Sequence, residues 1–302
     1  MREEPTSLLE VKGLTVERPE EMGERGIGLR NVSLSLGRDE ILVLAGETGC
    51  GKSALVRMVV GLPGPGVRAL DGEILFDGRD LLKLRSRDRR KLRRGEIAAV
   101  GRGVHEQFNP ERTVRRWLRE AVRLSGNREL DDEKKWSDFF YRVGIVEPER
   151  ILKRTMGDLS SLVVQRLMLM RALIGKARLI VCDEATAGLD RIAERQFIEL
   201  LSRIRGEEQV AVLLTTGSLR GVDRYADRVA VFYEGGILEA GPSHRILDNP
   251  TYAYTREFFL CAPRITHLPR ELATISREAS REAEEVVHRR ASPIQAPEDV
   301  AS

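Results

Sequence analysis

The sequence has few cysteines and lacks any long apolar run. Its 302 residues include three cysteines, Cys50, Cys182 and Cys261, with no Cys-x-x-Cys pair, which argues against a disulfide framework or a cysteine metal site. No stretch reaches the roughly 18 consecutive apolar residues of a membrane-spanning helix. The first residues carry acids instead of the apolar segment of a secretion signal. We therefore expect a chain that works in a reducing compartment without a membrane span of its own.

An excess of one charge is also missing. Charged residues make up 32% of the chain, yet the two signs nearly cancel to a net charge of +3. The net charge gives no argument for nucleic acid, and we expect no nucleic-acid partner. The 41% of hydrophobic residues is enough for a sizeable core.

What the sequence does contain is an alternation of strand-like and helix-like segments. Short continuous apolar runs predict buried strands, and alternating apolar and polar residues predict half-buried antiparallel strands. The expected strands are 8–16, 29–36, 41–45, 73–77, 178–182, 210–215, 228–234 and 236–240. The expected helices are Lys52 to about Val60, 111–143, 160–174 and 269–290. This order predicts an α/β fold with a largely parallel core sheet.

A glycine-rich segment matches the phosphate-loop pattern Gly-x-x-x-x-Gly-Lys-Ser/Thr. Glycines let consecutive N–H groups point at phosphate oxygens, and the following helix adds its positive N-terminal end. We expect Lys52 to reach the β- and γ-phosphates and the Ser53 hydroxyl to ligate Mg²⁺. A chance glycine turn is the weaker interpretation, because a buried strand precedes the segment and a helix follows it. The expected nucleotide-binding residues are Gly46, Glu47, Thr48, Gly49, Cys50, Gly51, Lys52 and Ser53.

Two acids follow the apolar strand 178–182. Asp183 would hold Mg²⁺ directly or through water, and Glu184 would polarise the attacking water as the catalytic residue. Alone, such a pair is as consistent with a surface salt bridge. Its position 130 residues after Ser53, beyond a phosphate loop, favours the catalytic interpretation.

These motifs, with Leu159-Ser160 between them and Leu189-Asp190 after them, resemble the ATP-binding subunits of ABC transporters over residues 8–262. The resemblance implies a P-loop NTPase fold with a RecA-like core, an antiparallel β subdomain and a helical subdomain at about 103–175. We expect a charged tail at 263–302 that is partly helical and then disordered.

The resemblance can be narrowed to one branch. Asp77-Gly78-Arg79-Asp80-Leu81-Leu82-Lys83-Leu84 and Tyr252-Ala253-Tyr254-Thr255 are similar to segments of the oligopeptide/dipeptide/nickel importers. The implied function is the ATP-binding subunit of an importer for peptides or related small solutes. The alternative is a regulatory or structural ATP-binding subunit with little ATPase activity.

The resemblance also implies cofactors and partners. The cofactors are ATP and Mg²⁺. The partners are a second ATP-binding subunit, forming a heterodimer, two membrane permease subunits and, indirectly, an extracytoplasmic solute-binding protein. The chain would lie on the cytoplasmic face of the cell membrane. Ser160 and Asp190 belong to motifs that act across the dimer, and Arg18 stands where an aromatic residue usually stacks on adenine, a contact that a guanidinium can also make.

Three further departures from the family pattern concern hydrolysis. Arg102 replaces a Gln that helps to hold Mg²⁺ and the attacking water, and its positive charge would repel the metal. The signature segment reads Leu159-Ser160-Ser161-Leu162-Val163, without the glycines that let the backbone approach the γ-phosphate. Gly217 stands in place of the switch histidine. The sequence therefore predicts ATP binding with impaired hydrolysis.

Two further features have more than one interpretation. The basic run 83–94 is expected to be a solvated helix, and contact with RNA or with anionic lipid headgroups is the alternative. Cys50 is expected to be a small loop residue, and a thiolate favoured by the loop amides is the alternative.

Overall fold

The computed structural model describes residues 7–19, 25–101, 109–217, 221–261 and 274–291. Its strands are β1 (Leu9–Pro19), β2 (Arg25–Leu36), β3 (Ile41–Ala45), β4 (Arg68–Phe76), β5 (Arg79–Asp80), β6 (Ile97–Gly101), β7 (Leu179–Asp183), β8 (Ala211–Thr216), β9 (Arg228–Tyr233) and β10 (Gly236–Pro242). Its α-helices are α1 (Lys52–Val60), α2 (Ser86–Arg94), α3 (Val114–Ser125), α4 (Trp136–Arg142), α5 (Pro148–Lys153), α6 (Ser161–Ile174), α7 (Arg191–Glu208), α8 (Ser243–Asp248), α9 (Ala253–Cys261) and α10 (Arg277–Ala291). Short 3₁₀ turns are η2 (Arg128–Leu130), η3 (Glu133–Lys135), η4 (Met156–Asp158) and η5 (Val222–Arg224).

The central element is a six-stranded sheet in the order β10-β9-β3-β8-β7-β6. Strands β6, β7, β8, β3 and β9 run parallel, and β10 joins the edge in antiparallel pairing with β9. All five residues of β3 are buried, which explains why this strand is a continuous apolar run. The largely parallel core sheet predicted from the sequence is confirmed.

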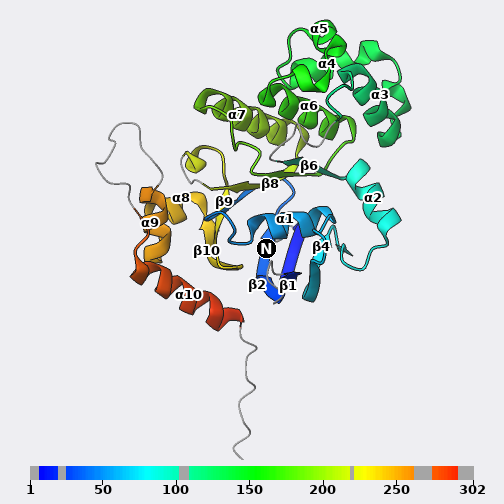
Figure 1. Ribbon diagram of the computed structural model, residues 1–302. Helices are drawn as coiled ribbons and strands as arrows, with labels where there is room; N and C mark the ends of the chain where they lie inside the picture. Colours follow the sequence, from blue (N-terminus) through cyan, green and yellow to red (C-terminus); the bar gives the residue numbers. More distant parts are fainter. Residues whose placement is uncertain (1–6, 20–24, 102–108, 218–220, 262–273, 292–302) are drawn as a thin grey trace, which may run out of the picture.

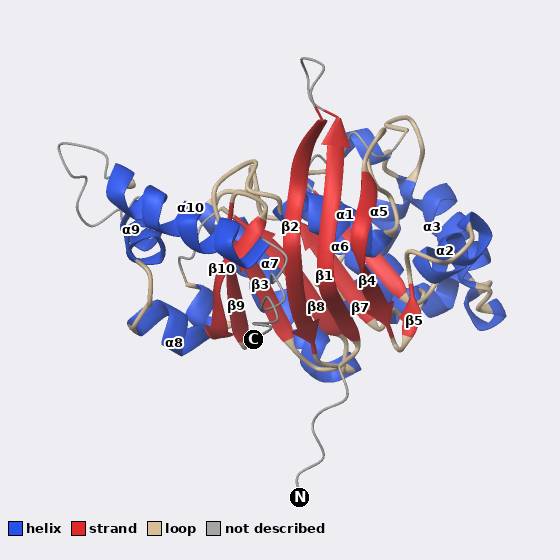
Figure 2. Ribbon diagram, turned by 90° about the horizontal axis from the view of Figure 1, so that it is seen from below, coloured by secondary structure: helices blue, strands red, loops and turns tan. Residues whose placement is uncertain are grey.

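A second sheet covers one face of the central sheet (Figures 1 and 2). Its strands are antiparallel in the order β2-β1-β4-β5. Helix α1 lies between the two sheets (Figure 1), where Leu55 and Val59 are almost completely buried. The phosphate-loop helix is therefore enclosed by apolar side chains from both sheets.

Helices α3 to α6 form a separate group above the opposite face (Figure 1). Trp117, Trp136 and Phe140 are buried there, as their size and clustering suggest. Residues 111–143 are largely helical, as predicted, but they form two α-helices and two short 3₁₀ turns. Gly126 adopts φ 73° and ends α3, and η2 and η3 connect α3 to α4.

Helix α10 packs against α9 and against the edge of the central sheet, at the far end of the molecule from α3–α6 (Figure 1). Its buried residues are Ala279, Ala283 and Val287, spaced four residues apart on one face. Because the buried face consists of two alanines and one valine, the sequence of the helix shows few large apolar residues, and its charged residues dominate the pattern. Residues 292–302, expected to be disordered, lie outside the described residues.

Within the part of the chain that the structure describes, none of the helices combines the length and the apolar character needed to cross a bilayer. The parallel strands place their carboxyl ends along one edge of the central sheet. Strands β3, β6, β7 and β8 all end on the same side of the sheet, which is where ligands bind in open α/β sheets. The phosphate loop, Asp183 and Gly217 each follow or end one of these strands.

Candidate nucleotide-binding site

The loop between β3 and α1 needs glycine at both of its ends. Gly46 has φ 150°, and a Cβ there would lie 2.5 Å from the carbonyl oxygen of Phe232. Gly51 has φ 109°, and its Cβ would lie 3.0 Å from the oxygen of Gly28. Any side chain at these two positions would push the loop away from β9 and β2.

The middle of the loop is open instead of crowded. Gly49 has φ 89°, and no heavy atom lies within 4 Å of where its Cβ would be. Glu47, Thr48 and Gly49 are exposed. Helix α1 begins after Gly51 with no side-chain cap, so its first N–H groups have no side-chain acceptor. An open, glycine-containing loop on an uncapped helix N-terminus is suited to phosphate oxygens.

Lys52 is the buried cation of this loop, with only 2% of its surface exposed. Its Nζ donates to the carbonyl oxygens of Gly46 and Glu47, both at 2.7 Å. A contact to Cys50 Sγ at 3.4 Å completes its surroundings. The ammonium group is held by the curl of the loop itself, so its position is set before any phosphate binds.

Ser53 and Asp183, the two expected Mg²⁺ ligands, are brought together by the fold. The Ser53 Oγ donates to Asp183 Oδ1 at 2.8 Å, across 130 residues of sequence. Thr215, completely buried on β8, donates from Oγ1 to the same oxygen at 3.1 Å. Hydroxyl and carboxylate oxygens are the ligands that Mg²⁺ prefers, so this donor set fits the metal.

Glu184 follows directly, at the turn after β7. Its backbone adopts φ 49°, an unfavourable value for a residue with a side chain. Its N–H donates to Thr215 Oγ1 at 2.8 Å. Thr215 thus fixes both the carboxylate of Asp183 and the backbone of Glu184. Strain of this kind is common where a side chain must face a reaction centre.

Thr215 was missed by the sequence analysis, although a signal existed. It is one of two hydroxyl residues that end the apolar run of β8, beside the strand that carries the acids. Gln165, in the segment after Leu159–Val163 that still matches the family pattern, is buried on α6. Its Nε2 donates to the carbonyl oxygen of Ala185, which ties α6 to the loop after Glu184.

Cys50 is buried in the loop, with 8% of its surface exposed. Burial raises the pKa of its thiol, and the nearby charge of Lys52 offsets only part of that effect. The thiolate interpretation of Cys50 is therefore not supported. Burial likewise raises the pKa of Cys182 to about 12, with the charge of Asp183 adding to the shift.

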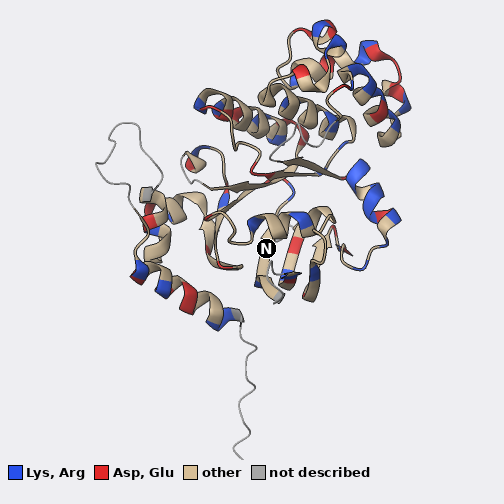
Figure 3. Cartoon of the chain, viewed as in Figure 1, with Lys and Arg blue, Asp and Glu red and all other residues tan. Residues whose placement is uncertain are grey.

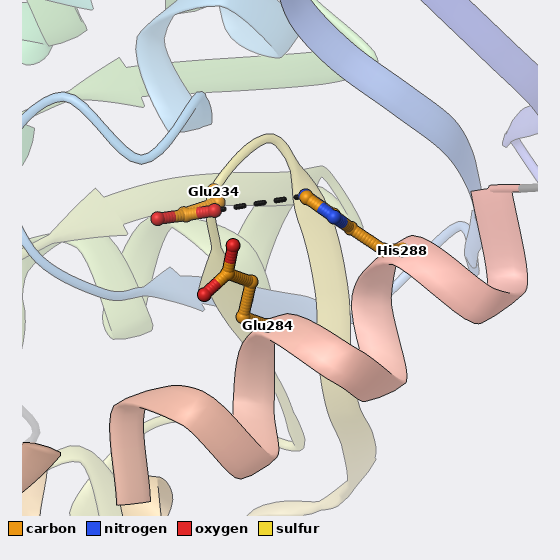
Figure 4. A group of neighbouring side chains, drawn as sticks. All are labelled: Glu234, Glu284 and His288. Atoms are coloured by element: carbon orange, nitrogen blue, oxygen red, sulfur yellow. Dashed lines mark ion pairs between the residues drawn. The ribbon is translucent and has the colours of Figure 1, made fainter. Parts of the chain in front are cut away.

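The turn between β9 and β10 is hydrogen-bonded to the phosphate loop. The Gly235 N–H donates to the Cys50 oxygen at 2.9 Å, and the Gly235 oxygen accepts from the Arg30 N–H at 2.8 Å. Beside it, His288 Nε2 on α10 lies 3.7 Å from Glu234 Oε2, with Glu284 next to both (Figure 4). All three side chains of this group are exposed. Helix α10 therefore reaches the turn that contacts the phosphate loop.

Arg18, the proposed adenine contact, is exposed near the end of β1. Its Cδ would lie 3.7 Å from a Cβ on Gly28, and the oxygen of Gly28 is the atom nearest to Gly51. Gly28 therefore lies between the side chain of Arg18 and Gly51 of the phosphate loop.

Ser160 and Asp190 both cap helices. The Ser160 Oγ accepts from the Val163 N–H at 3.4 Å at the start of α6. Asp190 Oδ1 accepts from the N–H groups of Ile192 and Ala193 at the start of α7. Leu162 is partly buried and packs against the core instead of projecting fully outward. Ser160 and Asp190 thus begin α6 and α7, away from the phosphate loop, and their role across a dimer stays a prediction.

The positions that depart from the family pattern differ in their surroundings. Gly217 follows β8, and none of the described residues places a heavy atom within 4 Å of where its Cβ would be. A side chain at this position would therefore meet no described residue at close range. Arg102, the residue that follows β6 in the sequence, lies outside the described residues.

A phosphate loop on a buried strand, beside an acid–hydroxyl pair on the neighbouring strands, defines a P-loop nucleotide-binding domain. The ABC transporter family profile matches residues 29–187, which is more than half of the chain. The chain therefore belongs to the ABC transporter family, and its relatives fall in the oligopeptide, dipeptide and nickel importer branch.

Three relatives illustrate the range. The peptidoglycan transport ATP-binding protein YejF of Agrobacterium fabrum is 32% identical over 85% of this chain and 47% of its own length. The dipeptide transport ATP-binding protein DppD of Bacillus subtilis is 32% identical over 82% of this chain and 74% of its own. The nickel import ATP-binding protein NikD of Pseudomonas putida is 30% identical over 83% of this chain and 93% of its own length. The chain thus spans about half of YejF and most of the other two.

Solved structures share the fold. The chain superposes on cbiO1 of Clostridium perfringens, part of the cbiONQ transporter, with a TM-score of 0.67 at 23% identity, over 80% of this chain and 91% of that one. It superposes on the dimeric cassette MJ0796, bound to ADP and Pi, with a TM-score of 0.64 at 20% identity. The superposition covers 78% of this chain and 98% of that one. The predicted ABC ATPase fold is confirmed.

Proposed function

We propose that this chain is the ATP-binding subunit of an importer for peptides or related small solutes, attached to the cytoplasmic face of the cell membrane. The names of relatives such as DppD support the solute class. Two permease subunits, a second ATP-binding subunit and a solute-binding protein would complete the assembly. The ATP-binding domain would span residues 8–262, with its helical subdomain at about 103–175 and a charged tail at 263–302.

The observation that carries the proposal is the assembly of Lys52, Ser53, Asp183 and Thr215 beside an open glycine loop. These groups come from two strands, β7 and β8, and from helix α1, yet their polar atoms meet at one sheet edge. Such an arrangement supports binding of a nucleoside triphosphate with its metal.

Each residue of the site would have a defined part in binding. The loop amides and Lys52 would hold the β- and γ-phosphates, and Arg18 would stack on the base. Ser53 and Asp183 would hold Mg²⁺, which supplies charge neutralisation at the phosphate oxygens. Glu184 would accept the proton of the attacking water.

The chain would bind ATP but hydrolyse it slowly. In a head-to-tail dimer, the site built on this chain's Lys52 and Glu184 would lack both the histidine and the Gln, which are replaced by Gly217 and Arg102. The other site would use the partner's phosphate loop and this chain's signature segment, Leu159–Val163. We propose that turnover, where present, occurs mainly at that second site.

The test is a Glu184→Gln substitution in the complete transporter complex. We expect the ATPase rate of the complex to stay within about twofold of the starting rate, because this chain's own site contributes little. A near-total loss of ATPase activity would refute the proposal that turnover occurs mainly at the second site. Glu194→Gln, an exposed position in the first turn of α7, is the matched control.

A second candidate is a regulatory or structural ATP-binding subunit, which the open space at Gly217 favours. The two candidates differ in one measurement. An importer ATPase gains activity when the chain is combined with its cognate ATP-binding subunit and permeases. A regulatory subunit binds ATP but adds no turnover.

A further inference from the structure

Helix α2 differs from the other charged helices in how its cations are arranged. Six of its nine residues are Lys or Arg, and one is acidic. The chain as a whole carries 50 basic and 47 acidic residues, so this density is local. In Figure 3, α2 is mostly blue, whereas α10 carries both colours.

Four of these cations lie on one exposed face. Positions i, i+3, i+4 and i+7 of an α-helix fall on the same side. The four exposed side chains with this spacing are Arg87, Arg90, Lys91 and Arg94. None of them has an ion-pair partner within the described ranges, although Arg85 beside them pairs with Asp88 at 3.4 Å.

Other helices of the chain pair their cations internally. On α7, Arg195 Nε lies 2.7 Å from Glu199 Oε1, four residues later. On α10, Arg281 pairs with Glu285 at the same spacing. Helix α2 offers its exposed face no acid in this way, so its positive charge is available to an external anion.

The opposite side of α2 fixes the helix to the core. Leu92 is buried, with 5% of its surface exposed. Arg93 Nη1 donates to the carbonyl oxygens of Val60 and Gly61 at the end of α1, at 3.3 and 3.1 Å. The pKa of Arg93 is lowered by burial and by the charges of Arg89 and Arg90, so the cations already repel one another. A bound anion would relieve that repulsion.

We propose that the exposed face formed by Arg87, Arg90, Lys91 and Arg94 binds the anionic headgroups of the membrane that holds the transporter. The inference rests on the proposed function for its location at the membrane. The face carries no aromatic side chain on which a nucleic-acid base could stack, and no large exposed apolar side chain to anchor a peptide. A surface of closely spaced positive charge suits the dense, mobile negative charge of a bilayer.

The test is co-sedimentation of the full chain with lipid vesicles, either of phosphatidylcholine alone or of phosphatidylcholine mixed with phosphatidylglycerol. We expect binding only to the mixed vesicles, and its loss when salt shortens the Debye length. Each Lys or Arg near an anionic leaflet is worth about fivefold in partitioning. The fourfold Gln variant at Arg87, Arg90, Lys91 and Arg94 should therefore bind at least about 100-fold more weakly.

A matched variant removes the same charge elsewhere. It carries Gln at four exposed positions that have no ion-pair partner within the described residues: Lys134, Lys135, Arg224 and Arg245. We expect this variant to lose clearly less vesicle affinity than the α2 variant. Equal loss in both variants, or wild-type binding no stronger to mixed vesicles than to phosphatidylcholine, would overturn the proposal.

Two other outcomes would replace lipid by another partner. If the α2 variant binds vesicles normally but no longer co-purifies with the detergent-solubilised permeases, the face binds an acidic protein segment instead. If it loses affinity only for RNA, the partner is nucleic acid. Fluorescent ATP-analogue binding, measured on the same samples, keeps the tests separate. Failure of the wild-type chain to bind ATP contradicts the proposed function, whereas normal ATP binding without lipid binding contradicts only this inference.

Discussion

In the loop from Gly46 to Ser53, the ammonium group of Lys52 has partners, and Gly46 and Gly51 fit against β9 and β2. At Gly217, after the neighbouring strand β8, the described residues leave open space at the position where the family resemblance implies a histidine. The first region is held by contacts that the empty protein needs in any case: Lys52 is satisfied by loop carbonyls and Cys50 by Gly235. A side chain at position 217 would have no such contacts among the described residues. Substitutions in the loop would therefore disturb contacts that hold the fold, whereas substitutions at position 217 would not.

The largest effect is expected from Lys52→Ala, which breaks the first region. Losing a buried cation that meets the phosphates should weaken ATP binding by at least about 100-fold, or about 3 kcal/mol. Equilibrium binding of a fluorescent ATP analogue measures it, and thermal unfolding checks that the variant folds. Arg57→Ala, exposed on the same helix, is the control. Unchanged affinity in Lys52→Ala would mean that the loop does not bind phosphate.

Gly217→His would repair part of the second region. The side chain has room among the described residues, none of which has a heavy atom within 4 Å of the Cβ position. We expect the ATPase rate of the complex to rise roughly tenfold, below the full contribution of a proton-transfer group because Arg102 remains in place. Gly217→Ala provides the control for backbone effects. A rate no higher than that of the alanine variant would show that the missing histidine is not what limits turnover.

Thr215→Val tests the link between the two regions. The hydroxyl is completely buried, donates to Asp183 and accepts from the Glu184 N–H. Its removal leaves that N–H without a partner, and we expect a loss of about 1–3 kcal/mol in the free energy of unfolding. Urea denaturation measures the change.

Thr255→Val is the matched control for that measurement. Thr255 is also completely buried, but its hydroxyl has no hydrogen-bond partner among the residues that the structure describes. Replacing it should be neutral or stabilising. Equal losses in the two valine variants would contradict the assigned role of Thr215.

Much of the fold was readable from local pattern. The runs at 41–45, 178–182 and 210–215 are apolar because both faces of their strands are buried, and each became a strand of the central sheet. The helix over 111–143 was predicted too long, although Gly126 followed by Asn127 is a local signal that ends a helix. The buried residues of α3 and α4 belong to one core, so the apolar pattern continues across the break.

The sequence by itself determined the phosphate loop, because its glycines and lysine stand at fixed neighbouring positions and their chemistry is local. It also determined that Asp183 ends a buried strand. Only the tertiary structure decided that Ser53, Asp183 and Thr215 share one oxygen, since their meeting depends on the order of β3, β8 and β7 in the sheet. It also decided that α2 presents four cations on one face without an internal partner, because pairing depends on which side of a helix the packing leaves exposed.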